Sequence, residues 1–479
     1  MRSIRSSLAI TFISSNSTTV INFGVNLVLA RLLSPEDIGV YSISVVLVAI
    51  AHVFREFGVS AYLLREKELT PEKIRSASGV LYACSTSLAV LIFLLASPAA
   101  AYYRHPGVEE VMHVLALGFL FIPFGAITST LLTRELRAKE QAIANAFGTV
   151  VFACSSLLFA WLGFRYMTSA WANFLSIVVT GLALAPYRPK TAPWLPSFKG
   201  WRKITHFGLG TVLGNSLNEI NNALADLMLG RLSTLHHVGL YSRANSLSNM
   251  FMQIAGPTVN YASLPYLAKI FHDTGTISKQ LSKATAYLSV LAWPALTVIT
   301  IYARETILFL FGETWLECVP IVAYTTATAA VCVCTHFLST ALIAIGRPYQ
   351  ASLPNLVLIV ARIACILLVF NGTLVSFGYG LLLGTAVALL PNLMMQAGIL
   401  HFSIRDFLTC IAPSLVVTVI VAAATALLKL CVSQAGLGYV WQILLLAPLA
   451  TLCWYAAIRM VSHPIADEVQ LALNRIRRR

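Results

Sequence analysis

Charged residues are scarce in this sequence. Only 11% of its 479 residues are Asp, Glu, Lys or Arg, whereas soluble domains contain about 25%. Hydrophobic residues make up 58% of the chain, and the mean hydropathy is +0.78. This balance excludes a soluble globular protein. The sequence is that of an all-α polytopic membrane protein, because helices satisfy their own backbone hydrogen bonds in lipid.

Acidic residues are the rarer of the two signs, with 19 Asp and Glu against 33 Lys and Arg. The net charge of +14 does not indicate a nucleic-acid partner, because the basic residues lie between apolar segments, as in membrane proteins that mark their cytoplasmic side. The longest polar connection, Pro186 to Lys203, contains no acidic residue, and no cluster of carboxylates or nucleophile arrangement appears elsewhere. We therefore do not expect an enzyme.

Cysteines in paired, ligand-like spacing are also lacking. The nine cysteines lie almost all inside apolar segments. Cys332 and Cys334, near His336, have no second pair, and such cysteines are more often packing residues. We predict no metal and no disulfide. A cleavable signal peptide is not expected either, because no cleavage motif follows "MRSIRSSLAI" and the apolar run continues into a full span.

Long apolar runs, in contrast, are abundant. A helix needs about 20 mostly apolar residues to cross the hydrocarbon core. This rule predicts about 14 transmembrane helices, the first and seventh being the most polar. Their expected ranges are 8–30, 38–63, 78–102, 111–132, 141–163, 168–186, 205–230, 239–263, 284–304, 316–345, 350–370, 374–400, 408–430 and 438–459.

The distribution of Lys and Arg between alternate loops predicts the orientation. One side, which includes both termini, has 24 of the 33 basic residues, and the other side has five. The remaining four, Arg55, Arg243, Arg362 and Lys429, fall inside predicted spans. The basic side is expected to be cytoplasmic, so both termini are predicted to be cytoplasmic.

A short sequence occurs twice in the chain. "RLLSPEDIGVYS" begins at Arg31 and "RLSTLHHVGLYS" begins at Arg231, 200 positions later. Six predicted spans separate the copies, so both would cross the membrane in the same sense. A second repeat matches Arg137 and Asn145 with Arg347 and Asn355, each 210 positions later. Together these observations predict an internal duplication.

The polar residues of the first and seventh spans follow the same register. Ser15, Thr19, Asn22 and Asn26 lie on one helical face, and the positions 200 residues later are Asn215, Glu219, Asn222 and Asp226. We expect two pseudo-symmetric six-helix lobes around a central cavity, plus two extra C-terminal helices. The predicted parts are an N-lobe 1–186, a basic cytoplasmic linker 187–204, a C-lobe 205–400, spans 401–460, and a cytoplasmic amphipathic basic tail 461–479 that would bind anionic lipids.

Two stretches resemble a known family. "ARLLSPEDIGVYS" (30–42) and "FREFGVSAYLLREKELTPEKIRSA" (54–77) are similar to the polysaccharide transporter family of Wzx-type flippases. That family belongs to the multidrug/oligosaccharidyl-lipid/polysaccharide exporter superfamily. The resemblance implies a flippase that moves a polyprenyl-pyrophosphate-linked oligosaccharide across the bacterial cytoplasmic membrane. It also implies two lobes around a cationic cavity.

Arginines inside the spans are the predicted pyrophosphate contacts, because Arg binds phosphate oxygens with two donors and is costly to keep in a membrane. Arg55 lies on one face with His52 and Glu56; the alternative is a local salt-bridged cluster. Arg243 would bind substrate or extend to the interface. Arg362 has no carboxylate near it in sequence and is expected to face a cavity.

Acidic and amide side chains complete the candidate site. Glu219, Asp226 and Glu56 would couple a proton or Na⁺ gradient to transport or act as a gate, the alternative being ion pairs with arginines. The asparagines at 22, 26, 215 and 222 would bind sugar hydroxyls or join helices instead. Lys429, at the end of its span, is expected to extend to the interface.

Two other functions compete with the flippase interpretation. A multidrug or small-molecule antiporter of the same superfamily would share the lobes, and a membrane-embedded polysaccharide polymerase would need catalytic groups that the sequence does not show. The expected partners are the lipid-linked oligosaccharide, anionic lipids and polysaccharide assembly proteins, with no nucleic acid. No cofactor is expected apart from the coupling ion.

Overall fold

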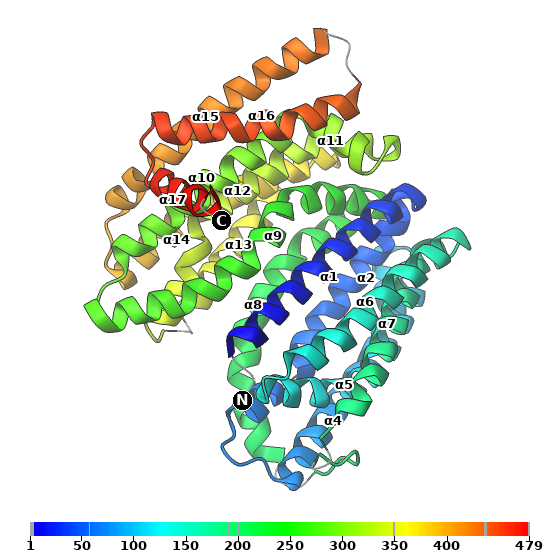
Figure 1. Cartoon of the computed structure of the whole chain (residues 1–479). Coiled ribbons are helices and arrows are strands. Elements are labelled where there is room, and N and C mark those ends of the chain that lie inside the picture. Colours follow the sequence, from blue (N-terminus) through cyan, green and yellow to red (C-terminus); the bar gives the residue numbers. More distant parts are fainter. Residues whose placement is uncertain are drawn as a thin grey trace. The chain divides into compact units, whose positions relative to one another are not determined.

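The computed structural model describes residues 4–56, 58–189, 192–198, 201–347, 350–434 and 438–477. In these residues the chain forms α-helices and short 3-10 turns, with no strand (Figure 1). The predicted all-α class is confirmed. The chain divides into two compact units, Met1–Ser242 and Arg243–Arg479. This division falls at Ser242, whereas the predicted lobes divide at 187–204, and the lobe boundaries stay a prediction.

The first unit is a bundle in which α6 packs on α7, α4 on α5, α1 on α6, and α8 on α2 and α4. Its elements are α1 (Ile4–Leu32), α2 (Pro35–Glu56), α3 (Val59–Arg65), α4 (Pro71–Tyr103), α5 (Gly107–Arg134), α6 (Ala138–Trp161), η1 (Arg165–Met167), α7 (Thr168–Leu184), η2 (Ala185–Tyr187) and α8 (Trp201–Leu232).

In the second unit, α13 packs on α14, α10 on α12 and α15, and α12 on α14. The first helix of this series, α9, begins inside the first unit and continues into the second. The elements are α9 (Leu235–Thr274), α10 (Ser278–Ile301), α11 (Ala303–Leu310), η3 (Glu313–Cys318), α12 (Val319–Ala344), η4 (Gln350–Ser352), α13 (Leu353–Val369), α14 (Leu374–Leu400), α15 (Ile404–Gln434), α16 (Tyr439–Met460) and α17 (Ile465–Arg477).

Each predicted span overlaps a long helix of the described chain, although some spans extend into a second, shorter helix. Eleven of the described helical segments are long and apolar enough to cross a membrane, so the chain is a multi-pass membrane protein. The other three predicted spans, 8–30, 205–230 and 239–263, lie on the more polar helices α1, α8 and α9. The count of fourteen therefore stays a prediction.

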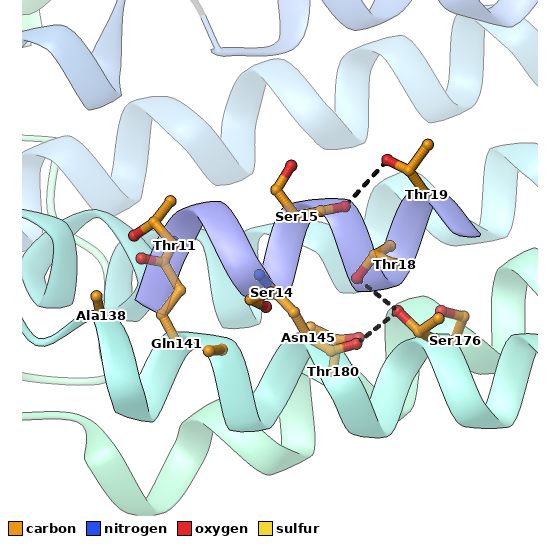
Figure 2. Close-up of a pocket in the computed structure, with 12 residues that line it drawn as sticks. Thr11, Ser14, Ser15, Thr18, Thr19, Ala138, Gln141, Asn145, Ser176 and Thr180 are labelled. Carbon is orange, nitrogen blue, oxygen red and sulfur yellow. Dashed lines mark hydrogen bonds between the residues drawn. The ribbon is translucent and has the colours of Figure 1, made fainter. Parts of the chain in front are cut away.

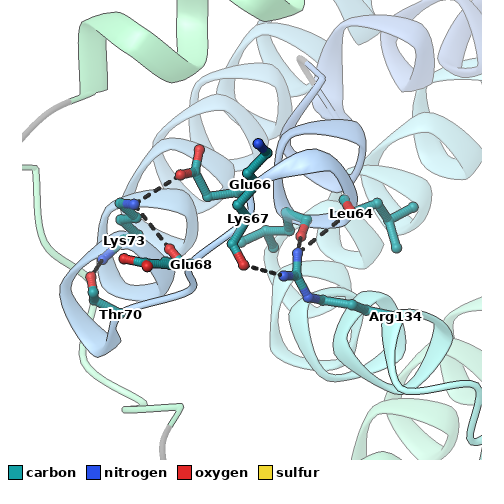
Figure 3. Close-up of polar contacts among 8 residues, drawn as sticks. Leu64, Glu66, Lys67, Glu68, Thr70, Lys73 and Arg134 are labelled. Carbon is teal, nitrogen blue, oxygen red and sulfur yellow. Dashed lines mark hydrogen bonds and ion pairs between the residues drawn. The ribbon is translucent and has the colours of Figure 1, made fainter.

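The second predicted span, 38–63, is not one helix. The structure ends α2 at Glu56 and starts α3 at Val59, because Gly58 has a φ of 68° in the left-handed region that favours glycine. Figure 3 shows how the end of α3 is held: the guanidinium of Arg134 donates to the carbonyls of Leu63 at 2.5 Å and Lys67 at 3.2 Å. The first bond satisfies a carbonyl in the last turn of α3, where carbonyls lack partners inside the helix, and the second holds the segment that follows α3.

The described part of the predicted linker packs against the first unit. The Ser197 amide donates to the Arg75 carbonyl at 2.9 Å, and the Arg75 side chain donates to the Leu195 carbonyl at 3.1 Å. The Arg188 guanidinium lies over the Trp194 ring at 4.1 Å. Residues 192–198 are thus fixed along α4.

The two copies of the repeated sequence contact each other reciprocally. A Cβ added to Gly39 would overlap the Leu235 carbonyl, and a Cβ added to Gly239 would overlap the Pro35 carbonyl. The Ser42 hydroxyl donates to that of Ser242 at 3.3 Å. All of these residues belong to the first unit. Both glycines therefore allow a backbone-to-backbone crossing of α2 and the start of α9.

The C-terminal helices pack on the second unit. α15 lies on α10, and α16 contacts both α15 and α11. The tail helix α17 buries Ile465 and Ala466 in an apolar cluster that includes Val290 and Val417. His463 anchors the turn before α17, accepting the Ile465 amide at Nδ1 and bonding Ser414 through Nε2 at 3.1 Å.

Candidate functional site

A polar cavity lies between α1, α6 and α7 in the first unit. Its volume is about 510 Å³, and Figure 2 shows hydroxyl and amide side chains converging on it. Ten of the twelve lining residues are polar and none is charged. The lining residues are Thr11, Ser14, Ser15, Thr18, Thr19, Ala138, Gln141, Ala142, Asn145, Thr149, Ser176 and Thr180.

Several hydroxyls in this cavity donate to backbone carbonyls of the preceding helical turn or of the neighbouring helix. Thr19 donates to Ser15 at 3.0 Å and Thr149 to Asn145 at 2.9 Å. Ser176 of α7 donates to the Gly148 carbonyl of α6 at 2.9 Å. A hydroxyl has one donor and two acceptor lone pairs, so these groups present acceptors to the cavity.

Close packing of α6 against α7 shapes the cavity wall. A Cβ at Gly148 would overlap the Thr180 hydroxyl and would lie 3.3 Å from the Ser176 hydroxyl. The Thr18 and Thr149 hydroxyls are 3.5 Å apart and connect α1 to α6. The glycine thus allows three helices to bring their hydroxyls together.

The predicted asparagines of α1 lie beyond the cavity on the same helix. Asn26 donates its amide to the Asn22 carbonyl at 2.9 Å. The side-chain oxygen of Asn22 is buried and has no hydrogen-bond partner among the described residues. Ser15 and Thr19, which share their predicted face, do line the cavity.

Arg55 is held by its predicted neighbour on α2. Its guanidinium donates to Nδ1 of His52 at 2.9 Å, which leaves the second ring nitrogen of a neutral His52 protonated. The His52 ring packs on Phe119 of α5, with 4.4 Å between centroids. The side chain of Glu56, the third member of the predicted cluster, lies outside the described side chains.

The structure describes three of the four side chains on the predicted polar face of α8, which consists of Asn215, Glu219, Asn222 and Asp226. Asn222 is exposed and Glu219 is half-buried, whereas the side chain of Asn215 lies outside the described side chains. Oδ1 of Asp226 is buried without a hydrogen-bond partner in the described part of the chain. An unpaired buried carboxylate is costly in its charged form, so Asp226 is the stronger candidate for reversible protonation.

Arg243 and Arg362 are both buried in the second unit, with 7% and 8% of their surface exposed. The Arg243 guanidinium lies over the rings of Phe311 and Trp315, at 5.6 Å and 5.4 Å. Its Nε has no hydrogen-bond partner among the described residues. Cation–π contacts cover the face of a guanidinium and leave its edge for other partners.

Arg362 of α13 bonds to two neighbouring helices. Its Nε donates to the Thr385 hydroxyl of α14 at 3.0 Å, and Nη2 lies 3.6 Å from the Cys332 sulfur of α12. Gly384 allows the close approach, since a Cβ there would lie 2.5 Å from the Arg362 Cα. These contacts join three helices, and a substrate-binding role for Arg362 stays a prediction.

Lys429 is held at the end of α10, and its predicted extension to the interface stays a prediction. Its ammonium donates to Glu305 at 3.0 Å and to the Ile301 carbonyl at 2.7 Å. Among the described residues, no group of three or more His, Cys, Asp or Glu is placed to hold a metal ion. Of the charged residues singled out in the sequence, the structure thus places Arg55 beside His52 and Lys429 beside Glu305.

The cavity residues of α6 and α7 were not predicted as site residues. Asn145 was noted only because it matches Asn355 in the internal repeat. A signal for them exists in the sequence. Gln141, Asn145 and Thr149 recur every four residues, as do Ser176 and Thr180, and this spacing puts each set on one helical face.

The chain is thus a multi-pass membrane protein with a polar cavity between three helices of its first unit. Residues 28–320 match the family model described as "Polysaccharide biosynthesis protein". The chain belongs to this family.

Proteins of similar sequence are named for polysaccharide biosynthesis. The chain is 22% identical over 318 residues to the lipopolysaccharide biosynthesis protein WzxC of Escherichia coli K12, covering 63% of each protein. It is 24% identical over 315 residues to the succinoglycan biosynthesis transport protein ExoT of Rhizobium meliloti, covering 64% of this chain and 63% of that protein. The matches thus span less than two thirds of these relatives' lengths.

Solved structures share the fold. The lipid II flippase MurJ in an inward closed conformation aligns with a TM-score of 0.72 at 14% identity, covering 95% of this chain and 99% of that chain. An inward-facing multidrug resistance MATE transporter of the MOP superfamily aligns with a TM-score of 0.63 at 16% identity, covering 80% and 94%. The chain therefore has the fold of this superfamily.

Proposed function

We propose that this protein is a flippase that translocates a polyprenyl-pyrophosphate-linked oligosaccharide across the bacterial cytoplasmic membrane by alternating access. Membership of the polysaccharide biosynthesis family supports the class of substrate. The observation that carries the proposal is the cavity of about 510 Å³, lined by hydroxyls and amides on membrane helices. Such a lining is costly in hydrocarbon unless it binds water or a polar ligand.

The task of a flippase explains the distribution of polar groups. A glycan and a pyrophosphate have to cross the hydrocarbon core while the polyprenyl tail stays in lipid. Sugar hydroxyls need hydrogen-bond partners, and the pyrophosphate needs cations. In the proposal, the asparagines at 22, 26, 215 and 222 contact the glycan, and Arg55, Arg243 and Arg362 contact the pyrophosphate.

Ion coupling is the second part of the proposal. Asp226, with its buried Oδ1, would take up a proton or Na⁺, and Glu219 and Glu56 would assist or act as a gate. Binding of the ion would neutralise the carboxylate and favour one conformation over the other. Both termini, including the basic tail, would lie on the cytoplasmic side against anionic lipids. The protein would transport its substrate without altering it.

A leaflet assay tests the proposed function. Vesicles from a deletion strain would be supplied with the wild-type protein, Arg55→Ala or Arg362→Ala, and the outer-face accessibility of the lipid-linked glycan would be followed. Arg55→Lys and Arg362→Lys are the matched controls that keep the charge but lose two-donor binding. The proposal expects translocation with the wild type, strong loss with Ala at normal protein levels, and intermediate rates with Lys.

Two results would overturn it. Normal outer-leaflet glycan in the deletion strain would exclude flipping as the function. Export of cationic dyes by the wild type, with no effect on lipid-linked glycan, would support the antiporter alternative, which the MATE-like fold makes the natural competitor.

A further inference from the structure

We infer that the cavity between α1, α6 and α7 binds an uncharged sugar of the lipid-linked oligosaccharide and excludes its pyrophosphate. This inference rests on the proposed function and assigns one part of the substrate to one cavity. It separates the glycan subsite from the arginines, none of which lines this cavity.

The first step is the polarity of the lining. The hydroxyls of Thr19, Thr149 and Ser176 donate to backbone carbonyls. The Gln141 amide donates to the Ser129 hydroxyl of α5 at 2.9 Å. The three hydroxyl protons are thus used inside the protein, as is one of the two N–H groups of the Gln141 amide. The three hydroxyls therefore offer a ligand oxygen lone pairs, apart from the one on Thr149 that faces the Thr18 hydroxyl at 3.5 Å.

A cavity rich in acceptors selects ligands that donate. Sugar hydroxyls and acetamido N–H groups donate hydrogen bonds, whereas a deprotonated pyrophosphate offers only acceptors. Asn145, an exposed residue on the cavity wall, adds an amide that both donates and accepts. The lining contains no Lys, Arg or His, so an anion here would lose its hydration without gaining a cation.

The cavity also lies where a substrate would be loaded. It includes the beginning of α6 and the end of α7. These helix ends connect to the basic segments 133–140 and 187–204, which the charge distribution assigns to the cytoplasmic side. A sugar made in the cytoplasm would therefore reach this cavity directly from the inner leaflet.

A more apolar groove adjoins the polar cavity along α1 and α6. It has a volume of about 470 Å³, seven of its twelve lining residues are Ile, Val or Ala, and its one charged lining residue is Lys139, which does not line the polar cavity. Ser14, Thr18 and Thr149 line both the groove and the polar cavity. These three hydroxyl residues therefore lie where the polar cavity and the apolar groove meet.

Binding measurements on the full-length protein in nanodiscs test the inference. The two probes are the lipid-linked saccharide extracted from the deletion strain and undecaprenyl pyrophosphate without sugar. The cavity variants are Asn145→Leu and Thr180→Val. The valine keeps the branched shape of Thr180 and removes its hydroxyl. Thr451→Val on α16 is the matched control, because its hydroxyl donates only to the Ala447 carbonyl in the described structure.

We expect Asn145→Leu to weaken binding of the saccharide probe about tenfold and Thr180→Val to weaken it about threefold, the range for losing one or part of one hydrogen bond. Binding of the sugar-free probe should change less than about twofold, and Thr451→Val should change neither. These differences would be accompanied by slower flipping in the leaflet assay.

Several outcomes would overturn the inference. Equal losses for both probes would mean that the residues act through the fold rather than on the sugar. Unchanged saccharide binding would place the glycan elsewhere while leaving the flippase proposal intact, provided the wild type still transports. Displacement of the saccharide probe by tetraphenylphosphonium, lost in Asn145→Leu, would assign the cavity to cations. A wild type that neither binds nor transports the saccharide would refute the proposed function itself.

Discussion

Alanine at Gly39 or Gly239 should disrupt the crossing of the repeated sequences. A Cβ at Gly39 would lie 2.7 Å from the Leu235 carbonyl carbon, and one at Gly239 would lie 2.6 Å from the Pro35 carbonyl carbon. Both obstacles are backbone atoms on rigid helices, so no rotamer change relieves the contact. The carbonyl oxygens are nearer still, at 1.8 Å in both cases, so the helices would have to move apart by about 1.5 Å to reach ordinary van der Waals separation.

The expected cost follows from this overlap. Overpacking of a close contact costs about 1–3 kcal/mol, and replacing Gly by Ala inside a helix returns up to about 1 kcal/mol. Each single variant should thus lose about 1–2 kcal/mol of stability. Moving the two helices apart once makes room for both methyl groups. The stability loss of the double variant should therefore be smaller than the sum of the two single losses, by about 0.5 kcal/mol or more.

Thermal unfolding of the purified protein in detergent measures these effects. Gly398→Ala is the control, since a Cβ there meets nothing within 4 Å, and its transition temperature should stay level or rise. Scan rates have to be matched, because unfolding of large proteins is often irreversible. Single variants as stable as the control would refute the packing argument, and fully additive losses would refute the shared separation.

Three further predictions concern the ends of the bundle. Arg134→Ala should expose segment 66–70 to proteases about tenfold faster, because bonds from a charged donor to the carbonyls of Leu63 and Lys67 are lost; an unchanged rate would contradict this. Burial lowers the pKa of His463, so its contribution to docking of α17 is present above about pH 6.5 and falls as the pH drops below that value. Limited proteolysis of α17 at pH 7.5 and pH 5 would show this, and His463→Gln should remove the pH dependence. Lys429→Met should lower stability by about 1–3 kcal/mol by leaving Glu305 unpaired, and a second change, Glu305→Gln, should recover most of the loss in thermal unfolding.

Periodicity and length were sufficient to predict the helices. Apolar runs of about 20 residues have few alternatives in lipid, so every predicted span overlaps a long helix. The break at Gly58 was not predicted, because a single glycine inside an apolar run is compatible with a continuous helix, and the left-handed φ is decided by packing.

The repeated sequence was recognised as a duplication, but its physical role was not. The contact of Gly39 with Leu235 and of Gly239 with Pro35 depends on how two helices cross, and sequence spacing within each helix says nothing about that crossing. Glycine at equivalent positions of both copies was the available signal.

The site was only partly predictable. Local pairs such as Arg55 with His52 follow from helical spacing. The partners of Arg362 and Lys429 lie 23 and 124 residues away, so sequence proximity could not identify them. The same holds for the cavity, which needs α1, α6 and α7 side by side.

Reconstitution tests the central claim most directly. Purified protein in proteoliposomes would be given the lipid-linked saccharide in one leaflet, and its appearance in the other leaflet would be followed with an impermeant glycan-modifying reagent. The account predicts that protein-containing vesicles transfer the saccharide lipid and that protein-free vesicles do not, with Asn145→Leu slower than Thr451→Val. Transfer at the protein-free rate by a folded, correctly inserted protein would contradict it.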